Sequence, residues 1–284
     1  MRAPDATAAP ARGRGHGAAL GRAPYRLILP AVLAAAFLAV PVAGLLVRAP
    51  WRDLLTRLGD PVVLDALRVS LVTSLAAVTI VVAVGIPLAW VLARTDVPGR
   101  ALLRALVVVP LVLPPVVAGV ALLAAFGRRG IIGGPLHDLF GVTLSFSTAA
   151  VVLAHAFVAL PFFVLAVEGA LRATDPELDV VAATLGASRW TTFRRVSLPL
   201  AGPGVLAGLV LAWARAIGEF GATITFAGNY PGVTRTMPNA IYVELQHDPD
   251  AAVLLSVLLL AVSVAVLVLL RERWFDPAVA GVRR

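Results

Sequence analysis

The sequence predicts an all-α membrane protein, a polytopic bundle of six spanning helices. Three observations favour this fold class. The 284 residues are 60% hydrophobic and only 14% charged, which lies far outside the composition of soluble domains. Six apolar runs are each long enough to cross a bilayer, which takes about 20 helical residues. The arginines are shared unequally between the polar segments that separate those runs.

The runs set the predicted organisation of the chain. Residues 1–26 are rich in Ala, Gly, Pro and Arg, and we expect them to form a disordered cytoplasmic tail. A transmembrane domain over 27–271 and a short cytoplasmic tail over 272–284 complete the chain. The first run is too long for the core of a signal peptide and is expected to stay as a span. The predicted spans cover residues 27–47, 69–93, 102–126, 148–171, 200–226 and 251–270.

Arginine placement predicts the orientation. All 24 basic residues are arginine; with the N-terminus inside, 16 lie on the cytoplasmic side and 7 on the other, and Arg215 lies within a span. The positive-inside rule therefore places both termini in the cytoplasm. The net charge of +8 is dispersed over the loops without an aromatic-basic patch, so we interpret it as a topological signal and expect no nucleic-acid partner.

Prolines interrupt the middle spans. Pro87 lies late in the second span, three prolines lie in the third, and Pro161 lies in the fourth. Each removes a backbone donor and kinks its helix. The kinks either shape the bundle only, or allow the third span to line a path and flex over residues 110–115.

A polar segment, residues 172–199, separates the fourth and fifth spans. Asp175 is expected to cap a helix that has Pro176 at its first position. Gly186 is expected to end that helix in the left-handed conformation, and Ser188 to cap a second short helix reaching about residue 196. The pair Leu198 and Pro199 should then begin the fifth span, because proline is tolerated at a helix start. The segment predicts two short helices presented to the cytoplasm.

The fifth span carries two opposite charges. Arg215 and Glu219 are four residues apart and could pair on one helix face, which would offset part of the cost of burying each charge. Gly218 and Gly221 flank the acid and permit close approach of another helix. The pair is either a structural ion pair at a dimer contact or a group near the conduction path.

Residue types exclude several activities. The chain has no lysine and therefore no P-loop, so a separate subunit or an ion gradient must supply energy. It has no cysteine, and no set of side chains indicates a catalytic, metal or cofactor site. His155 is expected to bond to a neighbouring helix, and Glu168 to form a structural pair with Arg172 at the cytoplasmic end of the fourth span.

The segment from Val180 resembles the EAA loop of ABC-importer permeases. That loop has Glu-Ala-Ala, three residues, Gly, nine residues, then Ile-x-Leu-Pro. This chain keeps the spacing but has Val180 in place of the Glu, Val181 in place of the first Ala and Val196 in place of the Ile. The resemblance implies that residues 172–199 form a cytoplasmic loop on which a separate ATPase subunit docks, and we call them the coupling loop. Its candidate residues are Asp179, Val180, Ala182, Gly186, Ala187, Ser188, Leu198 and Pro199.

The fifth span resembles that of the molybdate permease subunits of ABC importers. The matching residues run from Arg215 to Ala222 and continue with Thr223, Thr225, Phe226, Gly228 and Asn229. The resemblance implies a type I importer permease in the bacterial inner membrane, paired with a second copy of itself. It also implies two ATPase subunits that use ATP and magnesium, an extracytoplasmic oxyanion-binding protein, and molybdate or tungstate as cargo.

Two alternatives stay open. Sulfate permeases share the Gly-Glu-aromatic-Gly core of the fifth span, so sulfate or thiosulfate is a rival cargo. An ion-coupled secondary transporter could use Arg215 and Glu219 as its coupling site, although no two-half repeat is evident.

Overall fold

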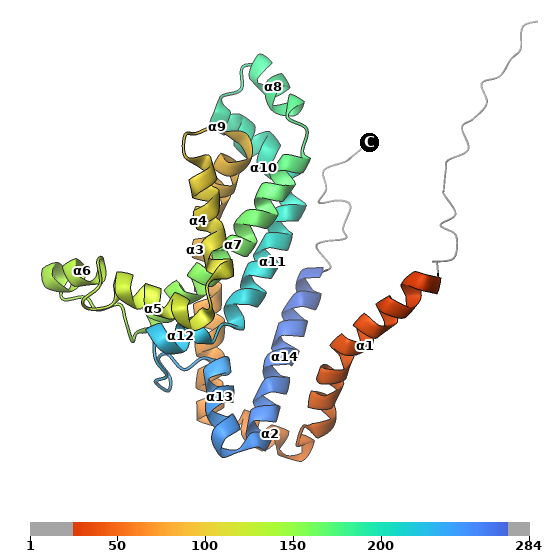
Figure 1. Cartoon of the computed structure of the whole chain (residues 1–284), viewed down its shortest axis with the longest axis vertical. Coiled ribbons are helices and arrows are strands. Elements are labelled where there is room, and N and C mark those ends of the chain that lie inside the picture. The colour runs from red at the N-terminus through yellow and green to blue at the C-terminus, as the bar shows by residue number, and fades with distance from the viewer. Residues whose placement is uncertain (1–24, 272–284) are drawn as a thin grey trace, which may run out of the picture. The chain divides into compact units, whose positions relative to one another are not determined.

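The computed structural model describes residues 25–271, and the regular secondary structure in that range is helical (Figure 1). The predicted tails lie outside the described residues, except that Tyr25 and Arg26 begin the first helix. The chain divides into two units, residues 1–47 and 48–284, and each is described by itself. The helices are α1 (Tyr25–Arg48), α2 (Leu54–Leu58), α3 (Pro61–Arg94), α4 (Arg100–Val112), α5 (Pro115–Phe126), α6 (Gly133–Phe140), α7 (Thr148–Ala173), α8 (Glu177–Thr184), α9 (Arg189–Thr192), α10 (Leu198–Leu200), α11 (Gly202–Ile217), α12 (Gly221–Phe226), α13 (Met237–His247) and α14 (Pro249–Arg271).

The first unit contains α1, which is apolar around its whole circumference. Leu27 and Phe37 are 65% and 79% exposed, and Pro30 and Pro41 lie inside the helix. A helix of 24 residues is about 36 Å long, enough to cross the hydrocarbon core. Apolar side chains on every face suit a lipid-facing helix.

The second unit is built around α3, α7 and α11, which pack against one another. Their shared core includes the fully buried side chains of Leu92, Phe163 and Leu171. Close approach of α11 to α7 depends on a glycine, because a Cβ on Gly204 would lie 2.1 Å from the Cβ of Ala170. Small residues at such contacts are what allows helices to associate in lipid, where no hydrophobic effect drives them together.

Polar caps fix where the long helices begin. The carboxylate of Asp60 accepts a hydrogen bond from the Val62 backbone N–H at 2.8 Å, and Pro61 occupies the first turn of α3. The Ser147 hydroxyl similarly accepts from the Ala150 N–H at 3.3 Å to start α7. Both devices satisfy a backbone donor that has no partner within the helix.

The start of α14 is held by Asp248. Its carboxylate accepts from the Ala251 backbone N–H at 3.0 Å and pairs with the Arg57 guanidinium at 2.5 Å. The Ala251 hydrogen bond, followed by that from Arg57, lowers the pKa of Asp248 below its ordinary value. Because the folded-state pKa is depressed, this contact stabilises the fold above the ordinary pKa and is lost as the pH falls through the lowered one.

The structure does not confirm the predicted count of six spans exactly. Among residues 25–271, four helices are long and apolar enough to cross a membrane, and a bent pair brings the number to five. The four are α1, α3, α7 and α14. The bent pair joins residues 189–200 to α11 at an angle of 71°.

The predicted third span is two helices, α4 and α5. The break falls at Leu113, whose ψ of 130° is extended, directly before Pro114 and Pro115. A residue before proline is driven out of the helical region by contact with the proline ring, which accounts for the break. The prolines therefore do more than kink a continuous span. After the break, α5 packs on α12 (Figure 1).

The predicted fifth span is broken as well. Pro199 lies in the first turn of α10, but residues 189–200 are helical throughout, so the bend that starts the long helix α11 falls at Ala201. Residues 193–197 form a π-helical turn, in which the Leu198 N–H bonds to the Phe193 carbonyl. A wider turn ahead of Pro199 relieves the clash that its ring would make with the carbonyl four residues earlier. At the other end, α11 stops at Ile217, and α12 begins only at Gly221.

Candidate functional site

The first half of the coupling loop folds as its sequence predicts, with one shift. The Asp175 carboxylate accepts from the Glu177 N–H at 2.9 Å, although α8 begins at Glu177, one residue later than expected. Gly186 has φ of +82°, and the Ala187 N–H bonds to the Ala182 carbonyl at 3.0 Å. This is the helix-ending turn in which glycine is strongly favoured.

The second half begins at the predicted cap and then differs. The Ser188 hydroxyl accepts from the Thr191 N–H at 3.2 Å, so Ser188 does begin α9. The helical segment does not end near residue 196 but continues through the π-helical turn into α10. Leu198 and Pro199 therefore lie inside this segment, and the coupling loop is joined to α11 through the bend at Ala201.

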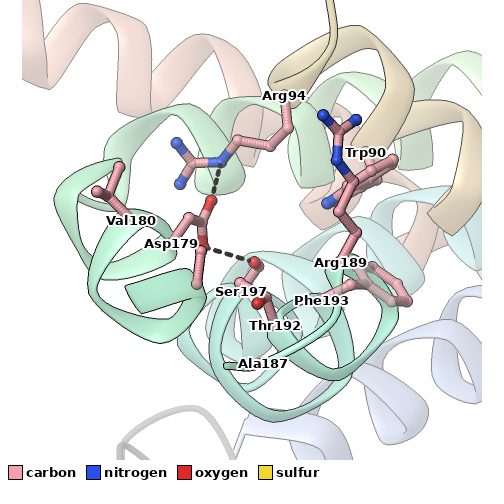
Figure 2. A pocket seen from close by; sticks show the side chains of 10 residues that line it. Trp90, Arg94, Asp179, Val180, Ala187, Arg189, Thr192, Phe193 and Ser197 are labelled. Atoms are coloured by element: carbon pink, nitrogen blue, oxygen red, sulfur yellow. Dashed lines mark hydrogen bonds and ion pairs between the residues drawn. The ribbon is translucent and has the colours of Figure 1, made fainter. Parts of the chain in front are cut away.

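Polar contacts hold the coupling loop against the end of α3 (Figure 2). Asp179 lies 3.5 Å from the Nε of Arg94 and accepts a 3.0 Å hydrogen bond from the Ser197 hydroxyl. Arg94 also donates to the Thr174 carbonyl at 3.1 Å and to its hydroxyl. Three separate segments, the ends of α3 and α7 and the start of α8, thus meet at one guanidinium.

A hollow of about 330 Å³ lies beside this contact. Arg94 and Arg189 bring two guanidinium groups to it, and Asp179 the one carboxylate (Figure 2). The full lining is Trp90, Arg94, Asp179, Val180, Ala183, Ala187, Arg189, Thr192, Phe193 and Ser197. Of the residues predicted for the coupling loop, the structure thus brings Asp179, Val180 and Ala187 to this hollow.

The outer surface of the coupling loop is apolar. Val180, Val181 and Leu185 are 63%, 53% and 83% exposed, and α8 buries none of its residues. Trp190 on α9 is 67% exposed and stacks at 5.4 Å on Phe193. An apolar patch on a segment with so few internal contacts is typical of a surface that another protein covers.

Glu168 is held by two arginines where the sequence indicated one. The carboxylate is 5% exposed and accepts from the Arg172 Nε at 3.0 Å, as expected, and also from Arg104 on α4. Arg172 continues to the Leu92 carbonyl at 3.0 Å. The spacing of four residues along one helix predicts the pair of Glu168 with Arg172. No sequence signal points to Arg104, which lies 64 residues from Glu168.

The charged pair predicted in the fifth span lies at the break between α11 and α12. The Arg215 guanidinium is 2.5 Å from the Glu219 Oε2, and Glu219 is 1% exposed. The other carboxylate oxygen accepts from the Ala222 N–H at 2.8 Å. Glu219 therefore caps α12 in addition to pairing with Arg215, a role that a continuous helix would not have allowed.

Gly221 is a close-packing position and Gly218 is not. A Cβ on Gly221 would lie 2.5 Å from the Pro115 Cβ, whereas one on Gly218 would meet its nearest neighbour, the Ala214 carbonyl, at 3.5 Å. The pairing of α12 with α5 thus depends on the absence of a side chain at Gly221.

We expect Gly221→Ala to lower the stability of the detergent-solubilised chain by about 1–3 kcal/mol, because overpacking forces α12 and α5 apart. Gly218→Ala is the matched control and should change the thermal midpoint little. Fluorescence-monitored unfolding of both variants checks this. Equal midpoints for the two variants would show that the contact with Pro115 does not matter.

His155 is fully buried on α7, and its Nδ1 lies 3.4 Å from the Thr73 hydroxyl on α3. This is the helix-to-helix contact that the sequence predicts for it. Within the described residues no group of three or more His, Cys, Asp or Glu side chains could hold a metal ion.

Residues 85–281 match the family model described as "Binding-protein-dependent transport system inner membrane component". The match covers more than half of the chain and includes the coupling loop, the bend at Ala201 and the charged pair. The chain belongs to this family. It is therefore a multi-pass membrane protein and a non-catalytic subunit of a transporter.

Curated relatives match this permease over most of its length. The "Molybdenum transport system permease protein ModB" of Mycobacterium tuberculosis is 49% identical over 245 residues, 86% of this chain and 92% of the relative. The protein of the same name in Escherichia coli strain K12 is 45% identical over 210 residues, 74% of this chain and 92% of the relative.

Solved structures show the same fold. A bacterial ABC transporter that imports the acidic polysaccharide alginate superposes with a TM-score of 0.71 at 17% identity, covering 88% of this chain and 94% of that chain. The same transporter in complex with an alginate-bound periplasmic protein gives 0.71 at 18% identity, covering 91% and 96%. The predicted type I importer permease fold is confirmed.

Proposed function

We propose that this permease carries molybdate into the cytoplasm as part of an ABC importer. The observation that carries this proposal is the 49% identity to a molybdenum transport permease over 92% of that relative's length. Because the match spans 86% of this chain, it includes the charged pair, the coupling loop and the packing glycines. Tungstate has nearly the same size and charge and is expected to be a second cargo.

We infer the subunits around the permease from its missing P-loop lysine and from its similarity to importer permeases. The chain lacks the lysine of a P-loop, so ATP and magnesium are used by a separate ATPase subunit. That subunit docks on the exposed apolar side chains of Val180, Val181 and Leu185. Two copies of the permease enclose the path, two ATPase subunits bind below it, and an extracytoplasmic oxyanion-binding protein delivers the anion. Both termini lie in the cytoplasm, on the side with more arginines.

The coupling loop departs from the usual pattern at Val180, Val181 and Val196, and its acid next to the first of these is Asp179. Val180, at the position of the usual glutamate, is exposed and apolar, while the neighbouring Asp179 is turned inward to Arg94. Docking on this loop therefore relies on apolar contact at Val180 in place of a charged one.

The test is uptake by proteoliposomes that contain the permease, its ATPase and its binding protein. We expect ATP-dependent uptake of labelled molybdate, competition by tungstate, and none by a hundredfold excess of sulfate. The permease alone should hydrolyse no ATP. Uptake of sulfate in preference to molybdate would move the cargo to the rival oxyanion. Uptake without ATP that collapses with an ionophore would instead identify a secondary transporter.

A further inference from the structure

The helix α8 has little apolar attachment to the rest of the protein. None of its residues is buried, and within the described chain its extensive packing is confined to α9 and the π-helical turn. Val181 on α8 and Leu185 at its C-cap are both exposed. Hydrophobic packing therefore cannot fix the position of α8 relative to the long helices, and polar contacts must do so.

Asp179 provides that attachment with both carboxylate oxygens. The Oδ1 accepts from the Ser197 hydroxyl at 3.0 Å, and the Oδ2 lies 3.5 Å from the Arg94 Nε. The Arg94 side chain is only 10% exposed and that of Asp179 is 27% exposed. The Arg94 Nε makes no hydrogen bond across this distance, but the partly buried ion pair is screened less than a fully exposed one.

Arg94 joins this contact to the longest helix of the protein. It lies in the last turn of α3, a helix of 34 residues, which corresponds to about 50 Å of length. Towards the other end of α3, the Ser70 hydroxyl accepts from the Met237 N–H at 2.7 Å and so holds the start of α13. A displacement of α8 that moves Arg94 thereby acts on one continuous helix, interrupted only by Pro87, that reaches the opposite side of the bundle.

We propose that Asp179 is a positioning residue that fixes the coupling loop to α3, so that displacement of α8 by an ATPase subunit moves the long helix. The proposal rests on the proposed function, because it assumes that an ATPase docks on α8. It assigns a role to a carboxylate that faces inward, away from the docking surface. The chain enters and leaves α8 through turns at Thr174 and Gly186, and these turns alone do not fix the orientation of α8. The contact between Asp179 and Arg94 fixes that orientation.

The structural part of the proposal is tested without any transport. The chain has no cysteine, so Leu185→Cys can carry a single spin label at the exposed C-cap of α8. In nanodiscs containing the full chain, Asp179→Asn should raise the mobility of that label. Asp96→Asn is the matched control, because it breaks a fully exposed carboxylate pair with Arg100 near the same end of α3. In the Asp96→Asn variant, the mobility of the label at position 185 should equal that in the parent protein.

The functional part is tested in the assembled transporter. Asp179→Asn should still bind the ATPase subunit but should lower oxyanion uptake per ATP hydrolysed by about five- to tenfold, the size of a typical coupling between sites. The double exchange Asp179→Arg with Arg94→Asp should recover part of the lost uptake, and Asp179→Glu should recover more than Asp179→Asn. A merely structural role would lower protein yield and leave the ratio of uptake to hydrolysis unchanged.

The outcomes separate this proposal from the proposed function. Unchanged label mobility and an unchanged uptake-to-hydrolysis ratio in Asp179→Asn would overturn the positioning role, whatever the cargo. A label effect in a transporter that carries no oxyanion would leave the attachment in place and overturn the cargo instead. If Asp179→Asn fails to accumulate, Ser197→Ala removes one of the two contacts, and the label should again become more mobile. An immobile label in Ser197→Ala would count against the proposal.

Discussion

Arg215→Met should remove most molybdate uptake. The substitution leaves the Glu219 carboxylate, 1% exposed, without its counter-charge. Removing one partner of a buried ion pair costs about 3–5 kcal/mol, and we expect the lower end because Arg215 is 30% exposed. That cost is comparable to the stability of many domains, so the variant should either accumulate poorly or misplace α12. Uptake by cells at trace molybdate, normalised to the amount of permease in the membrane, measures it.

The double variant Arg215→Met with Glu219→Gln should recover much of this loss. The amide oxygen of the glutamine at position 219 can still accept from the Ala222 N–H. The cap of α12 therefore survives while both charges are gone. Glu219→Gln alone completes the cycle and leaves an arginine that can reach water. The coupling energy from these variants gives the pairwise contribution.

The double variant also separates the two roles of the pair. Recovery of both membrane level and uptake would indicate a structural pair. If the double variant recovered its amount in the membrane but not its uptake, Arg215 would lie near the conduction path, where its charge acts on the anion. Additive losses, with the double variant worse than either single one, would contradict the pairing itself.

Gly186→Val should uncouple ATP hydrolysis from uptake. The backbone at Gly186 has φ of +82°, which costs an ordinary residue about 1–2 kcal/mol and a β-branched one more. No atom lies within 4 Å of the position that a Cβ would take, so this cost comes from the backbone and not from a clash. The turn between α8 and α9 should therefore change, and the apolar surface around Leu185 should no longer be presented as one patch.

Gly186→Asn is the matched control, because asparagine adopts the left-handed conformation more readily than other residues. We expect the Asn variant to keep ATPase binding in a pull-down and at least half of the uptake. The Val variant should insert into the membrane normally but bind the ATPase weakly. Wild-type binding and uptake in the Val variant would rule out a role for this turn in coupling.

Much of the coupling loop could be predicted because it is set by neighbouring residues. The caps at Asp175 and Ser188 and the left-handed Gly186 each depend on contacts within a few positions. The same is true of Arg215 and Glu219, which meet within one turn. The predicted third span is two helices in the structure, because its apolar run favours a spanning helix while its prolines favour a break. The run 102–126 is apolar except for Arg104, but two adjacent prolines decide its geometry.

The sequence by itself determined that the chain is helical, lies in the membrane, has no lysine for a P-loop and carries helix caps at Asp175 and Ser188 in one polar segment. Composition, lysine content and short-range caps are properties of the covalent chain, so they survive any arrangement of the helices. Only the tertiary structure decided that Asp179 faces Arg94 and that Glu219 caps a separate α12. Arg94 contacts Thr174, which lies 80 positions away from it in the chain, and a contact over that separation is fixed by how α3 and α7 pack. No periodicity or spacing along the chain records that packing, because it depends on the shapes of buried side chains brought together from distant segments.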